Sequence, residues 1–191
     1  LRAKGFYVSN GNSFISNAAE NLIVTGNFYS FGSMAFNNGA VVFDGVDQLI
    51  IPNVNDFLNH VIFNQSGTIT INQTNHNTLT LKGDLTLNTG VFSPGNSIIK
   101  IEGSWTNNSG TAAFAEGTSR VIFHGGNAQF CNTEQFNILE INKTVNFLYF
   151  QNSDIITSQT YDWTNGGFWV AGSASFYAYD LADPGISGLM F

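Results

Sequence analysis

The chain contains an internal repeat of strand-like runs, each of which ends in a glycine turn. Residues 23–28 return as residues 100–105, 77 positions later, and three further matches between the two copies lie 78 to 80 positions apart. A shorter spacing lies inside this repeat, because Gly83 and Gly103 follow similar alternating runs and are 20 positions apart. Periods of about 20 residues built from strands and glycine turns are typical of solenoids, in which successive coils stack on one another.

The local patterns indicate short strands and almost no helix. Apolar and polar residues alternate at 67–72, 78–82, 84–88, 97–102 and 137–142, and this alternation is typical of strands with one buried face. No sustained apolar period of 3.6 residues occurs, so α-helices are not expected. We expect six side chains on these strands to point into a core: Leu79, Leu81, Leu85, Leu87, Ile99 and Ile101.

We therefore predict an all-β fold, a right-handed parallel β-solenoid (β-helix) with coils of about 20 residues. A single segment, residues 1–191, would hold about nine such coils. The alternative is an antiparallel β-sandwich, which the hairpin-type pairs Asp44-Gly45 and Asn10-Gly11 leave open. Both ends of the chain resemble cuts, so we interpret the segment as an excerpt of a longer repetitive chain.

Two residue types suggest how the coils would hold together. Phe36 and Phe114, and likewise Phe43 and Phe123, occupy matching places in the longer repeat. We expect inward aromatic rings at such places to stack from coil to coil. Asn makes up about one residue in eight, an excess over ordinary usage. Asn suits tight turns, and stacked Asn side chains form hydrogen-bonded ladders.

The charge of the chain excludes several partners. The net charge is −7 with only six Lys and Arg residues, so nucleic acid, which requires clustered basic residues, is not an expected partner. No apolar run is long enough to span a bilayer, so membrane insertion is not expected either. The lone Cys131 is interpreted as a small buried apolar residue, because the neighbouring sequence offers no basic group to activate a thiol.

Longer phrases of the chain resemble a known class of protein. Residues 83–92, and residues 120–127 followed by 136–143, resemble the β-solenoid repeat regions of large secreted surface proteins and adhesins of Bacteroidetes-like bacteria. Residues 179–186 are similar to the same repeat phrases. The resemblance implies export, an extracellular or cell-surface location and an adhesive or structural role. It implies no catalytic residues.

The residues themselves point to no enzyme, cofactor or metal site. Sugar hydrolysis would need two facing carboxylates, and none of the acid pairs is accompanied by clustered Lys or Arg. Residues 44–47 lack the additional acids of a calcium loop, and the three histidines have no Cys partners at metal-binding spacing. The acids and histidines considered are Asp44 with Asp47, Asp180 with Asp183, Asp84 with Glu102, and His60, His76 and His124.

We accordingly expect a non-enzymatic structural or adhesive segment of an extracellular fibre or surface protein. Its expected partners are copies of itself, meeting end to end, or further coils of the same chain. The alternative is a carbohydrate-binding or polysaccharide-degrading β-helix. For that alternative, the candidate glycan-contact aromatics come from the most aromatic and least regular region: Trp163, Phe168, Trp169, Tyr177 and Tyr179.

Overall fold

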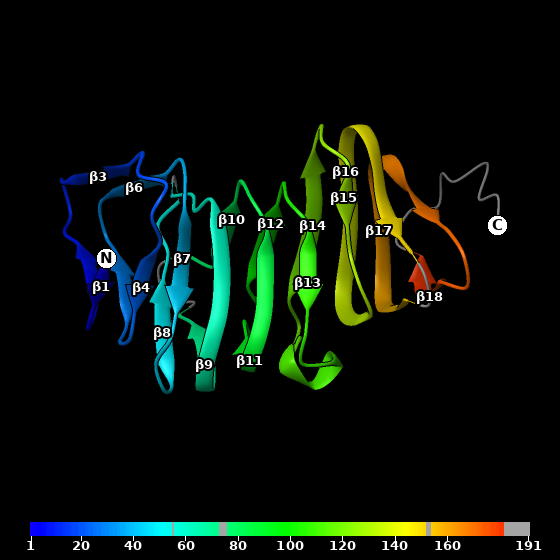
Figure 1. Cartoon of the computed structure of the whole chain (residues 1–191). Coiled ribbons are helices and arrows are strands. Elements are labelled where there is room, and N and C mark those ends of the chain that lie inside the picture. The colour runs from blue at the N-terminus through cyan, green and yellow to red at the C-terminus, as the bar shows by residue number, and fades with distance from the viewer. Residues whose placement is uncertain (55, 73–75, 152–153, 182–191) are drawn as a thin grey trace.

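The chain forms a parallel β-solenoid of about nine coils, as a computed structural model shows (Figure 1). The structure describes residues 1–54, 56–72, 76–151 and 154–181, with only the backbone of residues 180 and 181. Every pairing between named strands in these ranges is parallel. This confirms the solenoid and eliminates the β-sandwich, because a sandwich is built from antiparallel strands.

Each coil runs along three faces, where it forms strands or isolated bridges, and the shorter strands stay on one face. The first face contains β1 (Arg2–Ala3), β4 (Leu22–Val24), β7 (Ala40–Phe43), β13 (Trp105–Asn107) and β15 (Gln129–Phe130). The second contains β2 (Phe6–Val8), β5 (Phe28–Ser30) and β8 (Gln48–Ile51). The third contains β3 (Ser13–Ser16), β6 (Ser33–Phe36), β10 (Thr78–Leu81), β12 (Ile98–Ile101) and β14 (Arg120–Gly125).

Five longer strands continue around the corners from one face to the next. They are β9 (His60–Ile71), β11 (Leu85–Ser93), β16 (Glu134–Phe150), β17 (Ile155–Val170) and β18 (Ser175–Leu181). The pairing of β11 with β9 and of β17 with β16 shifts register at the bends. A single 3-10 turn, η1 (Thr111–Ala113), is the only helical element among the described residues.

The interior is a continuous apolar core in which aromatic rings stack from coil to coil. The six residues predicted to point inward are all buried, none more than 3% exposed. Consecutive ring centroids lie 4.7 to 6.0 Å apart along a column of five phenylalanines. The column consists of Phe43, Phe63, Phe92, Phe114 and Phe136. The expected stacking of inward aromatics is thus confirmed. Contacts between aromatic rings stabilise the fold beyond the burial of their apolar surface.

The matching of phenylalanines across the longer repeat is wrong, however. Phe43 pairs with Phe63 on the first face, whereas Phe123 pairs with Ile101 on the third. Phe36 lies on the third face as well, but Phe114 pairs with Phe92 on the second. Equal offsets in sequence therefore do not mark equivalent places in the solenoid.

Unequal coil lengths explain this error. Arg120 pairs with Ile138, 18 positions later, whereas Trp105 pairs with Cys131, 26 positions later. Two matched segments that are 77 to 80 residues apart consequently lie on different faces of the solenoid. The shorter spacing of 20 residues is a true coil: a Cβ added to Gly103 would lie 2.2 Å from the carbonyl carbon of Gly83. The close approach of these two turns requires glycine.

Asparagine ladders connect the turns of neighbouring coils, as the composition indicated. The Asn37 Nδ2 group donates to Asn17 Oδ1 at 2.7 Å, and the Asn108 Nδ2 group donates to Asn88 Oδ1 at 2.8 Å. In both pairs the partners are 20 residues apart. These side-chain bonds continue the backbone ladder into the corners, where the strands end.

Candidate functional site: a charged ladder and an aromatic row

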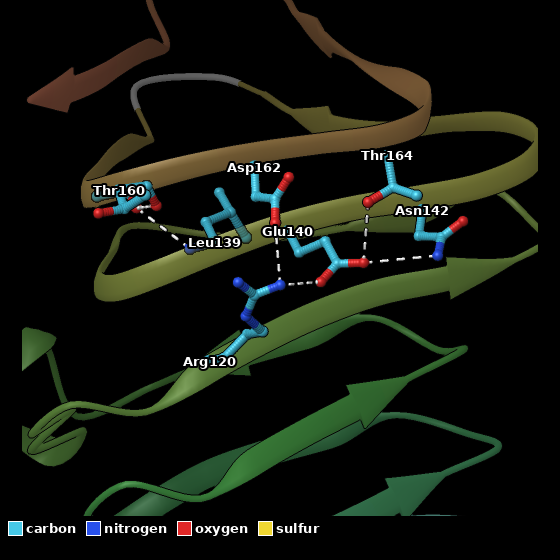
Figure 2. A network of polar contacts seen from close by, with 8 residues as sticks. Arg120, Leu139, Glu140, Asn142, Thr160, Asp162 and Thr164 are labelled. Carbon is cyan, nitrogen blue, oxygen red and sulfur yellow. Dashed lines mark hydrogen bonds and ion pairs between the residues drawn. The ribbon is translucent and has the colours of Figure 1, made fainter. Parts of the chain in front are cut away.

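A charged network crosses three coils on the outer side of the third face (Figure 2). Leu139 and Tyr161 are buried, so Glu140 on β16 and Asp162 on β17 point outward, and the two are paired in register. Arg120 on β14 reaches both: its Nη1 lies 2.6 Å from Glu140 Oε2 and 2.9 Å from Asp162 Oδ2. Two like charges opposite each other in a sheet are destabilising, and the guanidinium removes that repulsion.

The network is closed by further hydrogen bonds to Glu140. Its Oε1 accepts from Thr164 Oγ1 at 3.1 Å and from Asn142 Nδ2 at 3.5 Å. The Glu140 side chain is only 9% exposed. Burial disfavours the charged guanidinium of Arg120, but hydrogen bonds and charge from Glu140 and Asp162 outweigh this effect and raise the pKa of Arg120. Arg120 is therefore a permanent cation.

The arrangement is that of a structural ion network. Glycoside hydrolysis by paired carboxylates needs one carboxyl that stays protonated until it donates to the leaving group. Here a single permanent cation contacts both acids. Sequence reasoning missed the group because Arg120 and Asp162 are 42 residues apart. The outward position of Glu140 was predictable from the sequence, because the alternating run at 137–142 places this residue on the outer side of its strand.

The described acids of the pairs considered from the sequence each have a polar partner of their own. Asp44 lies 3.3 Å from Arg2, whereas Asp47 Oδ1 accepts from the backbone N–H of Thr68 at 2.9 Å. Asp84 accepts from the backbone N–H of Ser104, while Glu102 forms an ion pair with Lys82. The side chain of Asp180 and all of Asp183 lie outside the described residues.

The histidines are also dispersed. His60 Nδ1 lies 3.3 Å from Asp84 Oδ2, His124 Nδ1 lies 3.9 Å from Glu102 Oε1, and His76 lines a different part of the surface. Within the described ranges, no group of three or more His, Cys, Asp or Glu side chains is placed to hold a metal ion. No helix among the residues that the structure covers is long and apolar enough to cross a membrane.

Three of the five predicted glycan-contact aromatics line one pocket of about 450 Å³. They are Phe168, Trp169 and Tyr177, from the last bend between β17 and β18. Trp169 and Tyr177 are each 56% exposed, whereas Phe168 packs inward with its ring 5.5 Å from that of Phe150. Trp163 is also packed against the core, and its Nε1 donates to the Gly166 carbonyl.

The fifth, Tyr179, is 75% exposed and does not line this pocket. Exposure therefore leaves Trp169, Tyr177 and Tyr179 as surface aromatics, and glycan contact by any of the five stays a prediction.

Sequence reasoning missed an aromatic row on the outer side of the first face. We use this name for Phe130 on β15, Phe147 and Tyr149 on β16, and Trp169 on β17. Phe130, Tyr149 and Trp169 are paired in register on successive coils. The alternation at 147–150 could have indicated the row, because Leu148 and Phe150 are buried and the side chains between them therefore point outward.

A buried carboxyl lies inside the coils, close to the lone cysteine. Glu134 Oε2 accepts from Trp105 Nε1 and from Asn107 Nδ2, both at 2.9 Å. Burial raises the pKa of Glu134 to about 7, although its hydrogen bonds act in the opposite direction. Cys131 is buried, as predicted, and burial together with the nearby Glu134 charge raises the pKa of its thiol well above the usual range. Such a thiol is unreactive near neutral pH.

Comparisons with known proteins identify no relative: no family model, no curated protein and no solved structure matches this chain.

Proposed function

We propose that the chain is a rigid, non-enzymatic structural or adhesive segment of an extracellular surface protein or fibre. The observation that carries the proposal is the uninterrupted aromatic column, which links consecutive coils into one core. In a solenoid each coil contacts only its neighbours, so such a column resists bending and local opening along the axis. The charge matching around Arg120 supports the same role, because it keeps two outer acids in a static network.

The extracellular location is tested by labelling intact cells of the source organism. Antibodies raised against residues 1–181 should bind unpermeabilised cells or shed fibres, and brief external protease treatment should remove the signal. A cytoplasmic protein, probed in the same cells, supplies the control for lysis. Labelling that appears only after permeabilisation would contradict the proposed location.

End-to-end assembly is the partner that we propose for this segment. Among the described residues, β1, β2 and β3 are each paired on one side only, with β4, β5 and β6. A strand edge with unpaired N–H and C=O groups is a template for a further strand. The expected occupant is another coil, either of a longer chain or of an identical copy.

Tyr7→Pro tests this assembly at the backbone. Phe6 donates its N–H to Asn27 O, and Phe31 donates to Val8 O. Successive residues of a strand point their N–H groups to opposite sides, so the Tyr7 N–H faces away from β5. Proline removes that donor without breaking a bond to β5. Self-association measured by light scattering should weaken about tenfold or more.

Tyr7→Ala is the matched control, because it removes the exposed ring but keeps the N–H. It should associate as the unmodified chain does. A chain that stays monomeric at high concentration, or a weakening by Tyr7→Ala equal to that by Tyr7→Pro, would contradict pairing through this edge.

Carbohydrate binding is a second candidate, because Trp169 and Tyr177 are exposed around one pocket. Exposed aromatic rings with a few polar neighbours are common in ligand sites. Binding of glycans and a structural role are compatible in an adhesive segment.

A further inference from the structure

The aromatic row is an ordered line of rings that runs along the solenoid axis. Adjacent strands of a sheet are about 4.8 Å apart, and Phe130, Tyr149 and Trp169 lie on three adjacent coils (Figure 1 shows β15, β16 and β17 side by side). The Phe130 and Tyr149 rings are stacked with centroids 5.4 Å apart, and the Phe147 ring lies 6.2 Å from that of Tyr149 and 6.4 Å from that of Trp169.

The rings are exposed and yet held in place. Phe130, Phe147 and Trp169 are 45%, 43% and 56% exposed, far above the buried rings of the core. Each ring contacts at least one other, and Phe147 lies over Gly167, which has no side chain to displace it. Rings that are already ordered lose little conformational entropy when a ligand binds.

The surroundings of the row are polar and uncharged. Residues 125–133, 144–151 and 163–170 contain no Asp, Glu, Lys or Arg. Three charged residues adjoin these segments in sequence, and each has polar partners. Lys143 is buried, with its Nζ bonded to Asn127 O and Gln129 Oε1. Glu134 is buried inside the coils, and Asp162 belongs to the network around Arg120. Amide side chains are present on the same coils, among them the exposed Asn127 and Asn146.

We propose that the aromatic row binds a linear, neutral polysaccharide that runs along the solenoid axis across β15, β16 and β17. Sugar rings have faces of C–H groups, which pack on aromatic rings, and edges of hydroxyls, which bond amides. The spacing of the coils is close to the length of one sugar unit in an extended chain, so successive rings can contact successive units. The absence of charge favours a neutral glycan over an acidic one. The inference rests on the carbohydrate-binding candidate above.

A protein partner fits the row less well. Protein interfaces are enriched in Arg along with aromatic residues, and a polar rim surrounds an apolar core. The row offers a narrow line of rings with amides along it, and the segments that carry it, residues 125–133, 144–151 and 163–170, contain no Arg.

The test measures how much of the chain is retained on insoluble cellulose and on chitin, which are neutral polymers. The acidic comparison is polygalacturonate, and binding to it is measured as slower migration of the chain in gels that contain it. We expect retention on at least one neutral polymer and no retardation by polygalacturonate. Trp169→Ala and Tyr149→Ala should each weaken retention about tenfold. Tyr179→Ala removes an exposed ring outside the row and should have no effect. Unfolding midpoints of all variants show whether the fold is retained.

The possible results distinguish binding of a neutral polysaccharide along the row from carbohydrate binding in general. Retardation by polygalacturonate without retention on neutral polymers would overturn the inference but keep carbohydrate binding. Retention that Tyr179→Ala abolishes and Trp169→Ala leaves intact would also overturn it, because the site would then lie elsewhere. No binding to any of the three polymers would refute both. Loss of self-association in Trp169→Ala, without polysaccharide binding, would assign the row to a protein contact instead.

Discussion

Phe63→Ala is expected to lower the free energy of unfolding by about 3–5 kcal/mol, the usual cost of truncating a buried phenylalanine. The Phe63 ring is 1% exposed and lies 5.4 Å from that of Phe43 and 4.7 Å from that of Phe92. The substitution therefore leaves a cavity and interrupts the aromatic column in the middle of the solenoid. Chemical denaturation, followed by far-ultraviolet circular dichroism, measures the change.

Two further variants control this experiment. Phe63→Leu keeps most of the volume and should cost about 1 kcal/mol. Val145→Ala removes methyl groups from a side chain that is 61% exposed, and should change stability by less than about 0.5 kcal/mol. If Phe63→Ala were as mild as Val145→Ala, the column would not be a source of stability and the proposed rigid segment would lose its main support.

The second large effect is a pH dependence that arises from Glu134. Burial raises the pKa of this carboxyl from 4.5 to about 7. Between these values the folded protein keeps a proton that the unfolded chain releases. The protonated Glu134 thus contributes about 3 kcal/mol to the free energy of unfolding. This contribution is fully present below pH 4.5 and is lost as the pH rises to about 7.

Glu134→Gln isolates this effect, because glutamine does not titrate. The difference in unfolding free energy between the unmodified chain and Glu134→Gln should shift by about 3 kcal/mol in favour of the variant between pH 4.5 and pH 8. Glu116→Gln removes a surface carboxylate that bonds Gln135 and whose charge is only a minor cause of the raised pKa of Glu134, so it should leave most of the pH dependence from Glu134 in place. Parallel pH profiles for the unmodified chain and Glu134→Gln would show that Glu134 is not protonated in the folded state.

The strand pattern was predictable because it depends on neighbours in sequence. Alternation decides which side of a strand is apolar, and that was enough to identify the six inward residues from Leu79 to Ile101. Tight turns require glycine or asparagine wherever they occur, so the 20-residue coil between Gly83 and Gly103 was also visible. The burial of Cys131 was predictable because Cys is a small apolar residue and no basic group lies near it in the chain.

The candidate site was harder to predict, because its members come from different coils. Trp163 and Trp169 belong to the same aromatic stretch, yet the bend at Gly166 and Gly167 separates an inward ring from an exposed one. The register of β16 and β17 decides that Tyr149 lies beside Trp169. Neither fact can be read from periodicity, because the bends shift the register between paired strands.

The sequence by itself determined that this chain forms short parallel strands in coils of about 20 residues with an apolar interior, since periodicity and turn chemistry are local properties. Only the tertiary structure decided which residues share a face. Coil lengths of 18 to 26 residues, set by how each corner closes, bring Arg120 to Glu140 and Asp162 and place Phe123 on a different face from Phe43. Stacking joins residues one coil apart in space, and the number of residues in a coil depends on packing at corners that no single strand encodes.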